Sequence, residues 1–212
     1  MSKPVLVIGS GGHASVIIEI LMQVNCKILG VVSKDKPNQD GIFKDLKWYK
    51  SDKDVLSFNK NEILLVNAIG FLPGNNLRAS LHTKFRQLGY TFMTVIAPSA
   101  IISNYVNLAQ DVHLMPGCII NTNTSIAAGT ILNSGSIVEH DCKIGLHNHI
   151  APGAKLSGGV ETGEGVFIGI GANVIQNIKI CKGSVIAAGA NVFKNIDAES
   201  IVYSYRTETD KR

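Results

Sequence analysis

The chain has 212 residues, enough for one large domain or two of modest size. Its net charge is +4, only 17% of its residues are charged, and it has no long run of Lys or Arg, which argues against binding to nucleic acid. No apolar run approaches the length of a membrane-spanning helix, and no signal-peptide pattern precedes the first expected strand, so we expect no membrane insertion. Four scattered cysteines without a CxxC pair are typical of free thiols, and together these features predict a cytoplasmic protein.

Residues 1–97 predict a small α/β domain. Short apolar runs bounded by Gly or polar residues predict strands over 4–9, 27–32, 62–67 and 90–96, and apolar residues at helical spacing predict helices over 14–24 and 77–88. The polar segment 33–60 is expected to be a loop. This order of elements corresponds to about half of a doubly wound nucleotide-binding fold, a half-Rossmann-like domain.

The turn after the first strand, Gly9-Ser-Gly-Gly-His13, is rich in glycine. It fits the dinucleotide fingerprint with a final alanine, but the second strand ends at Ser33 rather than at the acidic residue that binds a ribose. A nucleotide diphosphate held at the helix N-terminus therefore fits better than a dinucleotide, with Gly11, Gly12, His13 and Ser33 as candidate contacts. A glycine turn without a ligand is the alternative.

Residues 98–196 have a period of six. Starting at Ile102, fifteen of sixteen positions at this spacing are aliphatic, and the exception is Thr162. Three residues after each of these positions, fourteen of sixteen residues are Gly, Asn or Asp, which tolerate tight corners. Three such units close one triangular coil, so the repeat predicts a parallel β-helix of roughly five coils, and the hexad is typical of the left-handed form. The remaining residues, 197–212, are predicted to be a polar tail.

Three of the six histidines, His140, His147 and His149, lie within ten residues. His140 and Asp141 occupy a corner of the predicted coil and should point outwards. An imidazole beside a carboxylate is a suitable general base, because the carboxylate fixes the tautomer and raises basicity. The alternative is that histidine replaces a corner glycine or asparagine without a chemical role, and for His147 this is the favoured interpretation.

The run Asn133-Ser-Gly-Ser-Ile-Val-Glu-His-Asp-Cys142, followed by His149-Ile-Ala-Pro-Gly-Ala154, resembles the active-site coil of a known family. This is the NeuD/PglD-like group of sugar acetyltransferases from the sialic-acid and bacillosamine pathways. Residues 7–13 and 90–99 are similar to other recurring stretches of that family, in the same order along the chain. The resemblance implies an acetyl-CoA-dependent transferase that acts on a nucleotide-linked sugar and forms a homotrimer with active sites between subunits.

The resemblance also implies roles for individual residues. His140 matches the general base, Asp141 the acidic residue that tunes it, and Asn133 a residue near the acceptor amine. His149 matches a contact to the thioester region of acetyl-CoA, and Ile170 and Ala188 match backbone contacts along the CoA groove. Ala188 replaces a glycine of the relatives, which would narrow that groove.

The sugar-nucleotide loops also follow from the resemblance. Gly11, Gly12 and His13 match the first loop, and Gly70 begins the second. Phe71-Leu-Pro-Gly74 makes this second loop longer than the tight turn of the amino-sugar enzymes. The usual Gly-x-Pro-Ala ending is replaced by Ile201-Val-Tyr-Ser-Tyr205.

The favoured function is N-acetylation of a 4-amino-deoxy sugar linked to UDP or dTDP, by direct transfer, with the oxyanion stabilised by a backbone N–H or by His149. O-acetylation, as of sialic acid, and a non-catalytic trimeric scaffold are the alternatives. A zinc lyase of the γ-carbonic anhydrase type would need a third histidine after His113 and His149, but that position is Ala154, so no metal is expected.

Overall fold

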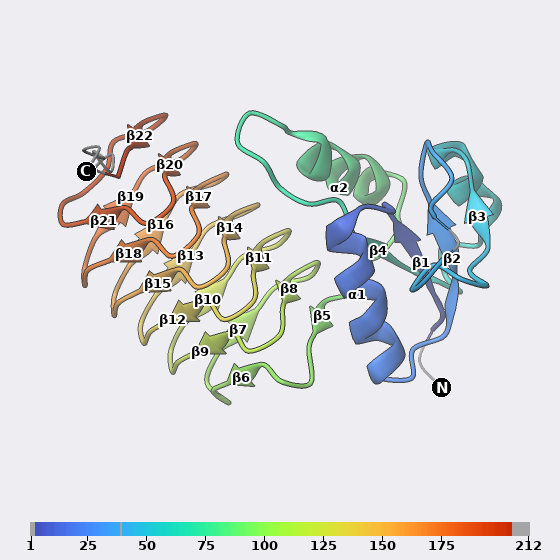
Figure 1. Ribbon diagram of the computed structural model, residues 1–212, viewed down its shortest axis with the longest axis horizontal. Coiled ribbons are helices and arrows are strands. Elements are labelled where there is room, and N and C mark those ends of the chain that lie inside the picture. Colours follow the sequence, from blue (N-terminus) through green and yellow to red (C-terminus); the bar gives the residue numbers. More distant parts are fainter. Residues whose placement is uncertain (1–2, 39, 205–212) are drawn as a thin grey trace, which may run out of the picture.

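The computed structural model describes residues 3–38 and 40–204. Its N-terminal part is a parallel sheet with the strand order β3-β2-β1-β4. The elements are β1 Val5–Ile8, α1 Gly12–Gln23, β2 Ile28–Val32, β3 Trp48–Tyr49, a 3₁₀ helix Asp52–Ser57, β4 Leu64–Asn67 and α2 Leu77–Gln87. Alternate residues of β1 face opposite sides of the sheet: Val5 and Val7 share a buried cluster with α1, whereas Leu6 and Ile8 pack in a cluster that includes Phe85 of α2. The two helices therefore cover opposite faces (Figure 1).

The segment 33–60 contains structure that the sequence did not predict. Trp48 and Tyr49 add a fourth parallel strand beside β2, and Ser51 and Asp54 form a capping box at the start of the 3₁₀ helix. A two-residue strand is too short to show a period, which explains why the hydrophobic pattern missed it.

The predicted parallel β-helix is confirmed. Its strands form three sheets, which we call sheet I (β5, β8, β11, β14, β17, β20, β22), sheet II (β6, β9, β12, β15, β18, β21) and sheet III (β7, β10, β13, β16, β19). Partners in neighbouring coils are 18 residues apart, as in Ile101 with Ile119, so each coil consists of three hexads. Figure 1 shows the coils stacked along one axis from β5 to β22.

Each strand of the β-helix is two residues long. In sheet I the strands are β5 Val95–Ile96, β8 His113–Leu114, β11 Ile131–Leu132, β14 His149–Ile150, β17 Phe167–Ile168, β20 Val185–Ile186 and β22 Ile201–Val202. In sheet II they are β6 Ile101–Ile102, β9 Ile119–Ile120, β12 Ile137–Val138, β15 Lys155–Leu156, β18 Asn173–Val174 and β21 Asn191–Val192. In sheet III they are β7 Asn107–Leu108, β10 Ser125–Ile126, β13 Lys143–Ile144, β16 Glu161–Thr162 and β19 Lys179–Ile180.

The six-residue repeat explains which side chains fill the interior of the β-helix and which residues form its corners. The aliphatic residue of each strand points inward, and from Leu114 to Val192 this column forms a continuous buried core. The corner residues three positions later, from Asp111 to Gly189, all have positive φ, the conformation that favours Gly, Asn and Asp. Thr162 is the one residue of this column that is not aliphatic. Its hydroxyl is satisfied because it accepts a hydrogen bond from the backbone N–H of Gly145 at 3.0 Å.

Both ends of the β-helix differ from the prediction. The expected strand 90–96 is divided: Phe92 forms an isolated bridge with Leu65, and Val95–Ile96 belong to sheet I, because Ile96 is one hexad before Ile102. At the other end, Ile201–Val202 pair with β20, so the predicted tail begins with one more strand. Residues 205–212 of that tail lie outside the described residues.

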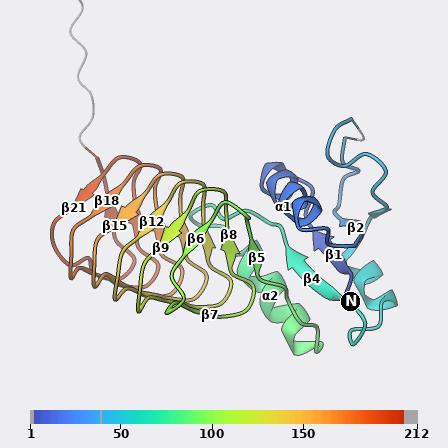
Figure 2. The ribbon, with the colours of Figure 1, turned by 90° about the horizontal axis from the view of Figure 1, so that it is seen from below.

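The two parts of the chain share a hydrophobic core. Residues of α1, such as Ile17 and Leu21, pack in one buried cluster with Val95, Met115 and Ile131 of the first coils. Figure 2 shows the α/β part at the end of the β-helix where β5 to β8 lie. All four cysteines are free. In the part of the chain that the structure describes, no helix is long and apolar enough to span a bilayer.

Candidate active site

The strand order places two loops at the switch point of the α/β sheet. β1 lies between β2 and β4, so the loops after β1 and β4 leave the same edge in opposite directions, where doubly wound folds bind ligands. Gly11 is the N-cap of α1 and has no side-chain cap. A Cβ atom at Gly11 or Gly12 would meet no atom within 4 Å, so these glycines leave open space in front of the uncapped helix N-terminus. Ser33 directly follows the neighbouring strand β2, and its hydroxyl donates to the carbonyl of Asp35.

His13 connects this loop to the β-helix. Its Nε2 lies 3.2 Å from Nδ1 of His113 in β8, and the two rings stack with centroids 5.4 Å apart. Gly70, in the loop after β4, lies over the same residue, since its Cβ position would be 3.6 Å from Cβ of His13. Burial, reinforced by His113 and Arg78, lowers the pKa of His13 to about 2. His13 is therefore a neutral hydrogen-bonding group rather than a cation at neutral pH.

A buried polar cluster behind His13 was missed by the sequence reasoning. Nε2 of His113 lies 3.4 Å from Oδ1 of Asp111, and an NH2 nitrogen of Arg78 lies 3.6 Å from the same oxygen. Arg78 is 2% exposed and also donates to the backbone carbonyls of Asn67, Ile69 and Gly129. Burial raises the pKa of Asp111 and lowers that of His113. Arg78 comes from α2, whereas Asp111 and His113 lie two residues apart in the β-helix, so no sequence signal links the arginine to the other two residues.

His149 and Asn133 meet where sheet I turns towards sheet II. The Nδ2 of Asn133 lies 3.1 Å from Nε2 of His149, while Oδ1 of Asn133 accepts from the backbone N–H of Ser134 at 2.8 Å. The Asn133 amide is thereby oriented so that its NH₂ donates to His149, and Nε2 of His149 is the acceptor. The proton of the neutral ring then lies on Nδ1, which donates to the carbonyl of Phe71 at 3.2 Å. Both ring nitrogens are therefore engaged.

Phe71 joins the second loop to sheet I. Its ring stacks on Phe167 with centroids 5.8 Å apart and meets the edge of His149 at 5.9 Å. Because Gly70 lies on His13 and Phe71 lies on His149, the loop after β4 contacts both the glycine loop and the Asn133–His149 pair. Phe71 belongs to the loop that the resemblance leads us to expect to be longer than in the amino-sugar enzymes.

The buried position of His149 has a consequence for stability. Burial is the main cause that lowers the pKa of His149 to about 4. Between pH 6.5 and 4 the unfolded chain binds a proton at this residue that the folded chain does not, so stability is lost as pH falls through this window. We expect His149→Asn to be destabilising at pH 8, and we expect its cost in the free energy of unfolding to shrink by about 2 kcal/mol between pH 8 and pH 5.

Chemical denaturation of both proteins at each pH, at one fixed protein concentration, measures this difference. Phe167→Leu is the matched control, because it disturbs the same packing without removing a titrating group, and its cost should stay constant with pH. A cost of His149→Asn that is equally constant would contradict the assigned burial of the neutral ring.

His140 and Asp141 lie at the corner between β12 of sheet II and β13 of sheet III. Nδ1 of His140 lies 2.7 Å from Oδ2 of Asp141, and the side chains are 58% and 57% exposed. Asn123, one coil earlier, donates to the other carboxylate oxygen at 3.2 Å. The hydrogen bond from His140, followed by that from Asn123, lowers the pKa of Asp141. The ionised carboxylate fixes the proton of the neutral imidazole on Nδ1 and leaves the lone pair of Nε2 directed away from it.

The three histidines that cluster in the sequence are separated in space. His140 lies at the corner between sheets II and III, His147 at the corner between sheets III and I, and His149 within sheet I. Six residues make one side of the triangular coil, so a short distance along the chain carries a residue to a different edge. His147 packs against His82 of α2 with ring centroids 5.1 Å apart.

Ile170 and Ala188 lie at the same kind of corner as Asn133, between sheets I and II, one and two coils beyond β14. The Ile170 side chain is 61% exposed, and its carbonyl accepts from the N–H of Gly189 at 2.8 Å. Within one chain, the structure therefore groups Asn133, His149, Ile170 and Ala188 along one edge and places His140 with Asp141 on another.

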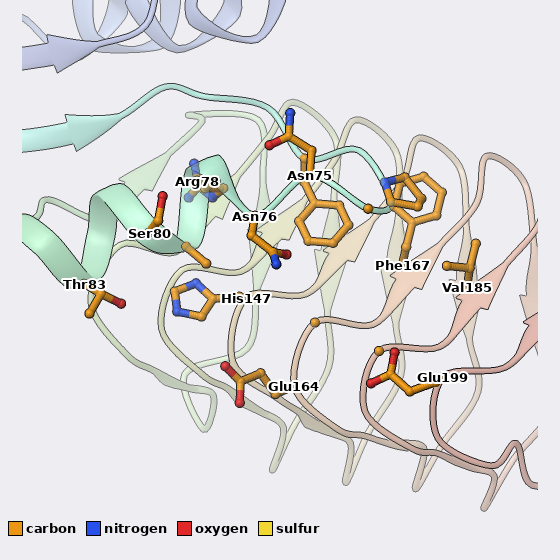
Figure 3. A pocket seen from close by; sticks show the side chains of 16 residues that line it. Asn75, Asn76, Arg78, Ser80, Thr83, His147, Glu164, Phe167, Val185 and Glu199 are labelled. Carbon is orange, nitrogen blue, oxygen red and sulfur yellow. The ribbon is translucent and has the colours of Figure 1, made fainter.

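A cavity of about 510 Å³ lies between α2 and the corner that joins sheets III and I. Figure 3 shows Asn75 and Asn76 on one side of it and Glu164 and Glu199 on the other. None of the site residues predicted from the sequence lines this cavity. Among the described residues there is also no group of three or more His, Cys, Asp or Glu side chains that could hold a metal ion.

Comparisons with known proteins show which family has this fold. A family described as the PglD N-terminal domain matches residues 4–85. The structure of PerB from Caulobacter crescentus, in complex with CoA and GDP-perosamine, is 31% identical, with a TM-score of 0.82 and 95% of each chain covered. Two related structures of perosamine N-acetyltransferase from that organism have one histidine replaced by Asn or Ala. No curated protein matched the chain.

The acetyltransferase domain of PglB from Neisseria gonorrhoeae is 25% identical, with a TM-score of 0.84, and covers 94% of this chain and 96% of its own. The same domain has been solved in complex with acetyl coenzyme A. The fold and these relatives define an acyltransferase of the hexapeptide-repeat class. The chain belongs to the PglD/NeuD-like family of sugar N-acetyltransferases.

Proposed function

We propose that this protein transfers the acetyl group of acetyl-CoA to the amino group of a nucleotide-linked 4-amino-deoxy sugar. The observation that carries the proposal is the His140–Asp141 pair at an exposed corner of the β-helix, in a chain that is 31% identical, over 95% of its length, to a protein solved with CoA and GDP-perosamine. Acetyl-CoA and nucleotide sugars are cytoplasmic metabolites, so the reaction assigns the protein to the cytoplasm.

In the proposed reaction, Nε2 of His140 accepts a proton from the acceptor amine as the amine nitrogen attacks the thioester carbonyl carbon. The tetrahedral intermediate collapses with cleavage of the C–S bond, and the imidazolium returns the proton to the departing CoA sulfur. Asp141 holds the imidazole in the required tautomer and stabilises its charged form. No acyl-enzyme is needed, because the two substrates are bound side by side.

The geometry of His149 bears on which group stabilises the oxyanion. Its Nδ1–H is bonded to the Phe71 carbonyl and its Nε2 accepts from Asn133, so the neutral ring has no free hydrogen to donate. Of the two donors considered from the sequence, a backbone N–H is therefore favoured over His149. The role that remains for His149 is to position Asn133, whose second amide hydrogen faces the acceptor.

The separation of the two groups of residues supports a homotrimer. Three copies packed around an axis parallel to the β-helix would bring the His140 corner of one subunit against the Asn133, Ile170 and Ala188 edge of the next. Acetyl-CoA would then lie in the groove between subunits, along Ile170 and Ala188. The nucleotide sugar would extend from Gly11, Gly12 and Ser33 past His13 and Gly70 towards Asn133.

A substrate panel tests the function. Purified protein is incubated with acetyl-CoA and with 4-amino sugars linked to UDP, dTDP or GDP, and the release of free thiol is followed. We expect one amino-sugar nucleotide to give rapid release together with an acetylated product, and the matching 4-hydroxy sugars to give none. Acetylation of a hydroxyl instead, as on free sialic acid, would identify an O-acetyltransferase, and binding of acetyl-CoA without transfer to any acceptor would contradict the enzyme assignment.

A further inference from the structure

The corner position of His140 recurs in every hexad, two residues after the inward aliphatic residue. The sixteen residues at this position are Asn104, Gln110, Pro116, Thr122, Ala128, Ser134, His140, Leu146, Pro152, Gly158, Glu164, Ile170, Gln176, Lys182, Ala188 and Lys194. Gly158 is the only glycine among them. Its φ lies outside the left-handed region, so the backbone does not require glycine at this point. Some other constraint must account for the missing side chain.

That constraint is the imidazole of His140. Gly158 lies 18 residues after His140, at the same corner of the next coil, and the N–H of Gly159 donates to the His140 carbonyl at 2.9 Å. A Cβ atom on Gly158 would lie 2.5 Å from Cε1, 2.6 Å from Nε2 and 3.1 Å from Nδ1 of His140. These distances are well inside van der Waals contact, so the ring lies directly against the backbone of Gly158.

A side chain at Gly158 would be tolerated by the fold but not by this ring position. His140 is 58% exposed, so its ring has room to swing outwards and relieve the clash. Such a swing would move Nε2 and lengthen the 2.7 Å bond between Nδ1 and Asp141. The added side chain would therefore change the position of the proposed base, whereas the packing inside the coil would stay the same.

We propose that Gly158 is a positioning residue for catalysis: the absence of its side chain lets the His140 ring lie against the next coil, with Nδ1 on Asp141 and Nε2 presented to the acceptor amine. This inference rests on the proposed role of His140 as general base. The ring is thereby held on two sides, by the carboxylate of Asp141 and by the flat backbone of Gly158.

The first test is Gly158→Ala. A displacement of about 1 Å at a reacting group can cost up to about a hundredfold in rate, so we expect kcat to fall about tenfold to a hundredfold. The KM for acetyl-CoA should stay within about twofold and the melting temperature should be nearly unchanged, because neither the CoA groove nor the buried core is altered. Gln176→Ala, at the same corner one coil further on, is the control and should keep normal turnover.

The second test combines Gly158→Ala with His140→Ala. If the glycine acts through the imidazole, the added methyl group has nothing to displace in the double variant, and its turnover should equal that of His140→Ala. An equal loss from Gly158→Ala in both backgrounds would overturn the inference, as would wild-type turnover of the single Gly158→Ala variant. Near-normal activity of His140→Ala would instead reject the general base itself, so the two failures are distinguishable.

Discussion

Replacement of His140 by alanine should lower the turnover of acetyl transfer by about a hundredfold to ten-thousandfold, the range that general-base catalysis contributes. The imidazole is exposed at a corner and donates to Asp141, so its removal should disturb no buried contact and should leave the melting temperature close to that of the wild type. The KM for acetyl-CoA should change little, because the groove residues lie on another edge. Steady-state thiol release, with the fraction of folded protein measured in parallel, gives the result.

His147→Ala is the matched control for this prediction. It also removes a corner imidazole from the same coil, but His147 packs against His82 and does not face the His140 edge. We expect its turnover to remain within a few-fold of the wild type once the folded fraction is taken into account. Equal losses in the two variants would show that the effect of His140 is structural.

The second prediction is that activity lost in two different variants is recovered when their subunits are combined, because the proposed active site lies between subunits. His140 lies between sheets II and III, whereas Asn133 lies between sheets I and II, so one chain cannot present both to the same acceptor in the proposed arrangement. Each single variant, His140→Ala and Asn133→Ala, should be nearly inactive. Subunits of the two variants, co-expressed with different tags, should recover activity, because some interfaces then combine an intact His140 with an intact Asn133.

Every trimer that contains both variants has both residues intact at one of its three interfaces, so the mixed species should have about a third of the wild-type activity. The mixed species is isolated by sequential purification on both tags, and its thiol release is compared with that of each parent. His140→Ala subunits carrying both tags serve as the control and should recover nothing. Activity of the mixture no higher than that of the parents would place both residues in one subunit and would contradict the interfacial site.

Two features that the family resemblance singled out can be placed in the structure. Phe71, in the loop that is expected to be longer than in the amino-sugar enzymes, contacts Phe167 and His149. Ala188 lies one coil beyond Ile170, at the corner between sheets I and II. In the proposed arrangement this edge binds CoA, so we expect the methyl group of Ala188 to narrow the CoA groove.

The sequence by itself determined the β-helix and the His140–Asp141 pair. A six-residue period specifies the inward residue and the corner of every coil by local preferences alone, and adjacent residues such as His140 and Asp141 remain adjacent whatever the rest of the chain does. The glycine loop could be predicted for the same reason, since the strand, turn and helix are consecutive in the chain.

Only the tertiary structure decided which of these residues meet. The contacts of His13 with His113, of Phe71 with His149 and of Gly158 with His140 join residues 100, 78 and 18 positions apart. The tertiary structure also places His140 and His149 on different parts of the coil although they are only nine residues apart. The reason is that the chain reaches the next corner of the triangular coil every six residues. Local patterns encode the coil, but the docking of loops and neighbouring coils depends on packing between distant segments, which a single sequence does not display.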